Sequence, residues 1–121
     1  MNKVLVVDDN SASRDLVRAI LKGAPYLIVE ASHGQEALEK IRDEQPDLVL
    51  LDIDMPVLNG FAVVRHIRED SRLAGLPVLA VTAFAMEGDR EKALAAGFTD
   101  YITKPVKARV LRKQVRELLG A

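Results

Sequence analysis

The 121-residue sequence contains no cysteine and no tryptophan, and aromatic residues make up 4% of it. The absence of cysteine excludes a disulfide scaffold, a cysteine-based zinc site and a thiol nucleophile. No apolar run approaches the ~18 residues of a membrane span, and the apolar run at the start is shorter than the core of a signal peptide. With an otherwise ordinary globular composition, the sequence predicts one cytoplasmic domain over residues 1–121.

The net charge of −1 conceals an uneven distribution of charge. Residues 104–117 include six lysines and arginines and one acid, so the rest of the chain carries an acidic excess. The near-neutral total and the few aromatic residues argue against direct nucleic-acid binding, which usually needs a strongly basic face with stacking side chains. We interpret the basic segment, including Arg112 and Arg116, as a surface for an acidic partner; a solvated helix face is the alternative.

Short apolar runs alternate with segments of helical periodicity along the whole chain. The predicted strands are residues 4–7, 26–31, 48–51, 78–81 and 101–102, and the predicted helices are 11–22, 34–45, 61–68, 89–96 and a last one that Pro105 begins. Ser11 or Ser13 is the expected cap of the first helix, and Val110 is expected on the apolar stripe of the last. Continuous apolar strands that alternate with helices predict a doubly wound α/β domain with five parallel strands.

Polar side chains stand where the predicted strands end. Asp8 and Asp9 follow the first strand, Asp52 the third, Thr82 the fourth and Lys104 the fifth. In open parallel sheets, ligands bind beyond the carboxyl ends of the strands. Clustered carboxylates favour Mg²⁺, and together with a lysine and a hydroxyl they suit phosphoryl transfer by charge neutralisation. Each motif alone also fits a solvated turn, a helix cap or a surface lysine; the combination favours a site.

These motifs together resemble the receiver domain of two-component response regulators. The motifs are Asp8-Asp9, the segment from Asp52 to Gly60, Thr82-Ala83 and Lys104-Pro105, and the resemblance covers essentially the whole chain. The residues after Thr82 and the opening acid pair look most like stand-alone DivK-type receivers and the receivers of hybrid histidine kinases. The resemblance implies a flavodoxin-like (βα)5 fold with strand order 2-1-3-4-5.

The resemblance also implies a role for each acid. Asp52 would accept a phosphoryl group from a phosphohistidine on a histidine kinase or phosphotransfer protein. Mg²⁺ would be held by the side chains of Asp8, Asp9 and Asp52 and by the backbone carbonyl of Asp54. The domain would catalyse its own phosphorylation and dephosphorylation at Asp52.

Further roles are implied for residues around the acids. Lys104 would contact the acyl phosphate, and its bond to Pro105 would be cis. Thr82 would move to bond a phosphoryl oxygen, and Tyr101 would swing inward as the second switch residue. Phe84 would slow loss of the phosphoryl group by shielding it.

Signalling would proceed through protein–protein contact. The resemblance implies an output surface formed by the fourth helix, the fifth strand and the last helix. No output domain follows in the sequence, so the expected partners are a kinase or phosphotransfer protein and a downstream protein effector. No direct contact with nucleic acid or membrane is expected, and the domain is expected to be a monomer.

An enzyme of another family is the alternative interpretation. Asp52-Ile53-Asp54 after an apolar strand also resembles the nucleophile motif of haloacid-dehalogenase-type phosphatases. That motif usually lies near the N-terminus and needs a downstream acid pair, whereas the acid pair in this chain lies upstream. Turnover of a generic phosphomonoester would favour the phosphatase, and stoichiometric labelling of Asp52 would favour the receiver domain.

Overall fold

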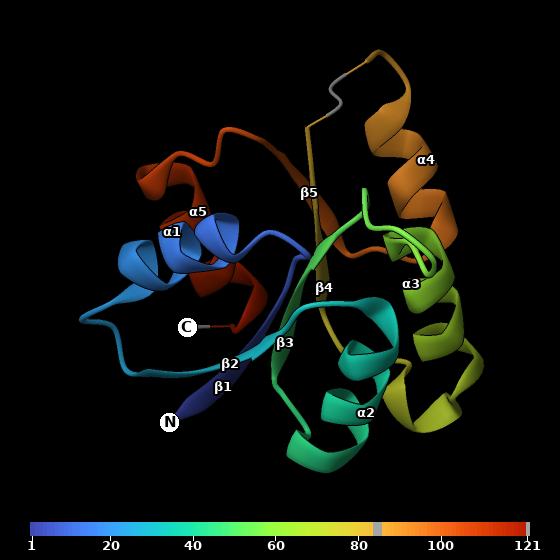
Figure 1. Ribbon diagram of the computed structural model, residues 1–121, viewed down its shortest axis with the longest axis horizontal. Helices are drawn as coiled ribbons and strands as arrows, with labels where there is room; N and C mark the ends of the chain where they lie inside the picture. Colours follow the sequence, from blue (N-terminus) through green and yellow to red (C-terminus); the bar gives the residue numbers. More distant parts are fainter. Residues whose placement is uncertain (84–85, 121) are drawn as a thin grey trace.

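A five-stranded parallel β-sheet lies at the centre of the molecule, and helices cover both of its faces (Figure 1). The computed structural model describes residues 1–83 and 86–120. Within these residues the strand order is β2-β1-β3-β4-β5, with β1 at Asn2–Val7, β2 at Tyr26–Ala31, β3 at Leu48–Asp52, β4 at Val78–Thr82 and β5 at Asp100–Thr103. The helices are α1 at Ser11–Leu21, α2 at Gly34–Glu44, α3 at Gly60–Glu69, α4 at Asp89–Ala96 and α5 at Ala108–Leu118, with a short 3-10 helix, η1, at Ser71–Leu73. The predicted flavodoxin-like fold and strand order are confirmed.

Two hydrophobic cores lie on opposite faces of the sheet. Val7 and Leu51 point into the core beneath α2, α3 and α4, whereas Val6 and Leu50 point into the core beneath α1 and α5. This alternation arises because successive side chains of a strand point to opposite faces. Since helices cover both faces, the central strands need apolar residues at every position, which explains their continuous apolar sequence.

The sheet brings the polar residues that end the strands to one edge. β1 and β3 are neighbours, and their register places Asp8 beside Asp52 at the carboxyl ends. β4 ends at Thr82, whose carbonyl accepts a hydrogen bond of 2.7 Å from the backbone N–H of Lys104, directly after β5. Four residues that are far apart in the sequence therefore meet at one level of the fold.

The cap of the first helix and the start of the last helix differ from the sequence prediction. Asn10 caps α1, since its side-chain oxygen accepts a hydrogen bond of 3.1 Å from the backbone N–H of Ser13. α5 begins at Ala108, because the preceding residue, Lys107, still has extended backbone angles. Pro105 therefore precedes the last helix and does not begin it.

The apolar stripe of α5 is narrower than predicted. Leu111 and Val115 are fully buried, but Val110 is 43% exposed. An α-helix turns by about 100° per residue, so Val110 lies to one side of the line that Leu111 and Val115 form. Among the residues that the structure describes, no helix combines the length and the apolar character that a membrane crossing requires.

Candidate functional site

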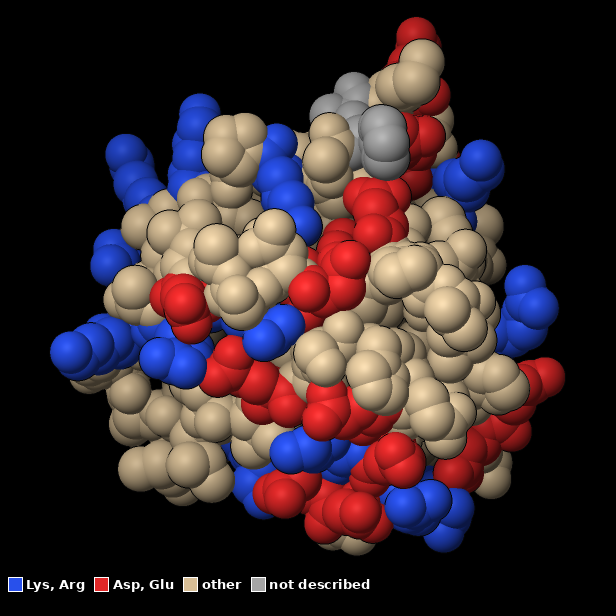
Figure 2. Space-filling view, in the orientation of Figure 1, with Lys and Arg blue, Asp and Glu red and all other residues tan. Residues whose placement is uncertain are grey.

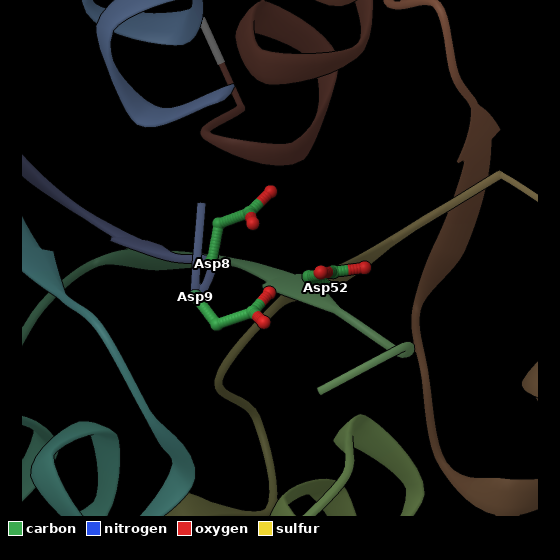
Figure 3. Close-up of side chains that lie close together, drawn as sticks. All are labelled: Asp8, Asp9 and Asp52. Carbon is green, nitrogen blue, oxygen red and sulfur yellow. The ribbon is translucent and has the colours of Figure 1, made fainter. Parts of the chain in front are cut away.

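Three carboxylates meet at the carboxyl ends of β1 and β3 (Figure 3). One oxygen from each of Asp8, Asp9 and Asp52 lies within 4.8 Å of the others. Asp8 and Asp52 are buried, with 5% and 2% of their surface exposed, whereas Asp9 is exposed to solvent. Carboxylates this close repel one another unless positive charge is near. The cluster therefore has the oxygen donors and the excess negative charge that fit Mg²⁺.

Lys104 supplies part of the compensating positive charge. Its Nζ atom lies 3.0 Å from Oδ2 of Asp8 and 3.6 Å from Oδ2 of Asp52. Burial by itself would lower the pKa of Lys104, but the hydrogen bond to Asp8 and the two carboxylate charges raise it above its usual value. Lys104 is joined to Pro105 by a cis peptide bond, as the resemblance implies. The lysine is thus positively charged and contacts both buried acids.

The surroundings of Asp52 change the ionisation of its carboxyl group. Burial, together with the negative charges of Asp8 and Asp54, raises the pKa of Asp52 to about 6. The backbone N–H of Asp54 and the charge of Lys104 act in the opposite direction but do not cancel the effect of burial. The folded protein therefore disfavours the ionised form of Asp52 unless further positive charge is bound nearby.

Backbone N–H groups orient the two buried carboxylates. Oδ1 of Asp8 accepts a hydrogen bond of 2.9 Å from the N–H of Asn10, and Oδ1 of Asp52 accepts one of 3.1 Å from the N–H of Asp54. Each acid therefore bonds the residue two positions later in the turn that follows its strand. In both acids the other oxygen, Oδ2, is the one that Lys104 approaches.

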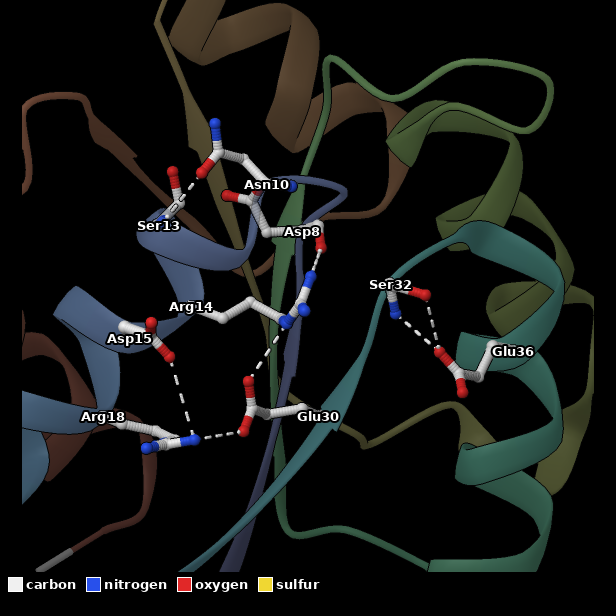
Figure 4. Close-up of polar contacts among 9 residues, drawn as sticks. All are labelled: Asp8, Asn10, Ser13, Arg14, Asp15, Arg18, Glu30, Ser32 and Glu36. Atoms are coloured by element: carbon white, nitrogen blue, oxygen red, sulfur yellow. Dashed lines mark hydrogen bonds and ion pairs between the residues drawn. The ribbon is translucent and has the colours of Figure 1, made fainter.

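Arg14 stabilises the turn after β1. The sequence analysis did not identify this residue. Its guanidinium donates a hydrogen bond of 2.6 Å to the backbone carbonyl of Asp8 and one of 3.0 Å to Oε1 of Glu30 on β2 (Figure 4). Arg18 donates a hydrogen bond of 2.8 Å to the other carboxylate oxygen of Glu30. The hydrogen bonds from Arg18 and Arg14 hold the pKa of Glu30 below its usual value despite partial burial. A carboxylate on β2 thus helps to hold the start of α1 against the acidic cluster.

Thr82 is hydrogen-bonded on the side of the site opposite Asp8. Its buried hydroxyl group donates a hydrogen bond of 2.8 Å to Oδ2 of Asp54. The backbone nitrogen of Ala83 lies 3.4 Å from the same oxygen. Asp54, Thr82 and Tyr101 border a pocket of about 240 Å³, which Ile53, Phe61, Met86, Asp89 and Lys92 complete. Burial and the charges of Asp89 and Asp54 raise the pKa of Tyr101. The two predicted switch residues therefore border a common pocket beside the acids.

The match to known families decides what kind of site this is. A model of the response regulator receiver domain matches residues 4–116. The chain belongs to the response regulator receiver family. It is thus a receiver domain of a two-component system, a signalling protein of phosphorelays. Nothing in the part of the chain that the structure describes favours the haloacid-dehalogenase-type phosphatase. Receiver domains in general interact with histidine kinases and with downstream effectors.

Relatives and solved structures agree with this membership. The polar-differentiation response regulator DivK of Brucella anthropi is 36% identical over 117 residues, which is 97% of this chain and 95% of the relative. A crystal structure of a response regulator from Chloroflexus aurantiacus superimposes with a TM-score of 0.93 at 28% identity, covering 99% of this receiver domain and 98% of that chain.

One similar structure contains a metal ion. The receiver domain of a Pseudomonas aeruginosa sensor histidine kinase matches with a TM-score of 0.89 at 32% identity, over 99% of this receiver domain and 98% of that chain. It was crystallised with a magnesium ion coordinated in its active-site cleft. In this receiver domain, the cluster of Asp8, Asp9 and Asp52 could hold a metal.

Acidic and basic side chains gather in different parts of the face drawn in Figure 2, without being fully separated. Acidic side chains form a band across its middle, and lysines and arginines lie along the side of α1 and α5 as well as at the lower and right-hand edges. Arg112 links α5 to α1, because its Nε donates a hydrogen bond of 3.1 Å to the carbonyl oxygen of Ile20. Arg109 and Lys113 instead line a groove with Tyr101, between β5 and α5. Arg112 thus ties α5 to α1 and is exposed to solvent, as are Arg109 and Lys113.

Most of the predicted site residues lie close together in the structure. Asp8, Asp9, Asp52 and Lys104 form one cluster, and Thr82 approaches it through Asp54. The predicted shielding residue, Phe84, lies outside the described residues. The hydrogen bond between Thr82 and Asp54 was not predicted, since 28 positions separate the two residues in the sequence.

Proposed function

We propose that Asp52 is the phosphoryl acceptor of this receiver domain, and that its donor is a phosphohistidine on a histidine kinase or phosphotransfer protein. One observation carries the assignment. The Asp52 carboxylate is buried between two further acids and an ammonium group, with an oxygen 3.6 Å from Nζ of Lys104. Charge-neutralising groups around a carboxylate suit phosphoryl transfer, in which positioning and electrostatics supply most of the catalysis.

The proposed transfer needs no additional reactant. An oxygen of the ionised Asp52 carboxylate attacks the phosphorus of the phosphohistidine, a P–O bond forms and the P–N bond breaks. The leaving imidazole nitrogen takes up a proton from solvent water. Lys104 pairs with the oxygens of the transferred group, and the hydroxyl group of Thr82 donates a hydrogen bond to one of them. Attack of water on the same phosphorus regenerates Asp52 and releases inorganic phosphate.

We propose that Mg²⁺ is the cofactor, held by the carboxylates of Asp8, Asp9 and Asp52 and by the backbone carbonyl of Asp54. When bound, it would neutralise the negative charge of the carboxylates and of the phosphoryl oxygens. Two of these acids are buried and mutually repelling, which supports the assignment.

Mg²⁺ should stabilise the folded receiver domain, and Asp9→Asn should remove most of this effect. At ten times its Kd, a ligand that binds only the native state adds about 1.4 kcal/mol, or roughly 5 °C in Tm for a domain of this size. Asp9 is exposed, so its substitution leaves the core intact. Thermal melts with MgCl₂ and with NaCl of equal ionic strength measure the effect. An equal Mg²⁺ response in the variant would contradict the assignment of Asp9.

Acetyl phosphate with Mg²⁺ tests the acceptor directly. Intact-mass measurement should show the gain of one phosphoryl group by the wild type and none by Asp52→Asn. Asp43→Asn, which alters an exposed acid on α2, is the matched control and should be labelled like the wild type. If the wild type gains no phosphoryl group and does not bind beryllofluoride, the proposed function is wrong.

We further propose that residues 1–121 act as a single, monomeric domain that signals through α4, β5 and α5. The groove between β5 and α5 supports this proposal, because Arg109 and Lys113 line it together with the predicted switch residue Tyr101. Asp100 and Glu117 also line this groove, but its lysines and arginines outnumber them, so it suits an acidic surface on a protein effector.

A further inference from the structure

The Thr82 hydroxyl group is already engaged by a carboxylate before any phosphoryl group arrives. Its Oγ1 donates a hydrogen bond of 2.8 Å to Oδ2 of Asp54, which is the usual length of an O–H···O hydrogen bond. Thr82 is 3% exposed, whereas Asp54 is exposed to solvent. The acceptor oxygen also lies 3.4 Å from the N–H of Ala83, so the carboxylate rests against the end of β4.

A hydroxyl group carries one proton and can donate it to one acceptor at a time. The function proposed above requires Thr82 to donate to an oxygen of the phosphoryl group on Asp52. The Asp54 carboxylate and the phosphoryl group are therefore mutually exclusive acceptors of the same proton. Forming the second hydrogen bond requires the first to break, and the stability of the first is subtracted from that of the phosphorylated state.

We propose that the Asp54 side chain is a latch, which holds Thr82 in the unphosphorylated arrangement and competes with the phosphoryl group for its hydroxyl proton. The inference rests on the proposed function and adds a positioning residue to it. Asp54 acts through Thr82, and its side chain is distinct from the backbone carbonyl assigned to the metal. The latch sets how readily a phosphoryl group at Asp52 shifts the domain to its signalling arrangement.

The charge of Asp54 is a second influence that must be separated from the latch. Asp54 is two residues from Asp52, and its negative charge disfavours further negative charge there. Removing Asp54 therefore helps an anion to bind at Asp52 through two routes, of which only one needs the Thr82 hydroxyl group. A double-mutant cycle with Thr82 isolates that route.

The test measures the affinity of the Mg²⁺-loaded domain for beryllofluoride, a phosphoryl mimic, by isothermal titration calorimetry. Four proteins are compared: the wild type, D54A, T82A and the double variant. Loss of a competing hydrogen bond should make D54A tighten binding about three- to tenfold more in the Thr82 background than in the T82A background. Thermal melts of each protein show that the variants are folded.

The conservative variant T82S provides a second cycle, because serine keeps the hydroxyl group. D54A should tighten binding in the T82S background as much as in the wild type. Equal tightening by D54A with and without the hydroxyl group would overturn the latch and leave the charge effect alone. No tightening in any background would overturn it as well. If the wild type does not bind beryllofluoride, both the proposed function and the latch are wrong. If it binds beryllofluoride but the cycle shows no coupling between Asp54 and Thr82, only the latch is wrong.

Discussion

Asp52→Asn should raise the free energy of unfolding by about 3 kcal/mol at pH 7.5 in the absence of divalent cations. Burial and the neighbouring acids raise the pKa of Asp52 to about 6 in the folded protein, compared with about 4 for an aspartate in an unfolded chain. Two pKa units correspond to roughly 3 kcal/mol of preference for the neutral form. Asparagine is neutral and of the same size, so it removes the cost of burying the charge.

The pH dependence of this difference follows from the direction of the pKa shift. A carboxyl group with a raised pKa in the folded state binds its proton more tightly there, so the wild type loses stability as the pH rises from about 4 to about 6. Below this window both proteins hold a neutral side chain and should differ little. Above it the difference should be full and constant.

Urea denaturation between pH 4 and pH 8, in EDTA, measures this difference. Asp43→Asn is the control, since Asp43 forms an exposed ion pair with Arg42, and such pairs contribute at most about 1 kcal/mol. Its effect should be small and destabilising. Equal stability of Asp52→Asn and the wild type at pH 7.5 would show that Asp52 is not destabilising in the fold.

Gly60→Ala should destabilise the domain by about 3 kcal/mol or more, because its new methyl group would overlap the backbone. A Cβ at Gly60 would lie 2.6 Å from Cα of Ile53 and 2.7 Å from the carbonyl oxygen of Asp52. Neither atom belongs to a flexible side chain that can move aside. Either α3 or the segment after Asp52 must therefore shift.

The same shift should reduce labelling of Asp52 by acetyl phosphate, since the displaced segment carries the acceptor and Asp54. Gly75→Ala is the matched control, because a Cβ there meets no atom within 4 Å. It should leave stability and labelling unchanged. Urea denaturation and intact mass provide the two measurements. A change of less than 1 kcal/mol for Gly60→Ala would mean that the contact between α3 and the acceptor segment relaxes easily.

The sequence predicted which residues meet at the candidate site because these residues occupy strand ends. Continuous apolar runs reveal buried parallel strands, and the carboxyl ends of such strands meet at one edge. Asp8, Asp52 and Thr82 could therefore be placed together without coordinates. Lys104 could be added by the same reasoning. What pattern alone could not supply was the assignment of individual roles, which came from the resemblance to the family.

The sequence analysis failed where a contact joins elements through long side chains. Arg14 reaches Glu30 and the backbone of Asp8, and Arg112 reaches the carbonyl of Ile20 on another helix. The reach of an arginine depends on how neighbouring elements pack, and no local pattern encodes that distance. For the same reason the hydrogen bond by which Arg112 ties α5 to α1 was not predicted. The contact of Arg112 with an acidic partner stays a prediction, since its side chain is exposed.

Hydrophobic periodicity and the polar residues at strand ends thus determined the fold class, the strand positions and the edge that carries the acids. The periodicity and the strand ends can be identified from short stretches of sequence, because each strand or helix must bury its apolar side chains whatever its neighbours are. Tertiary structure alone decided that Thr82 donates to Asp54, that Lys104 contacts both buried acids and that burial raises the pKa of Asp52. These features depend on distances between separate elements and on the exclusion of water, which arise only when the sheet and its helices are packed together.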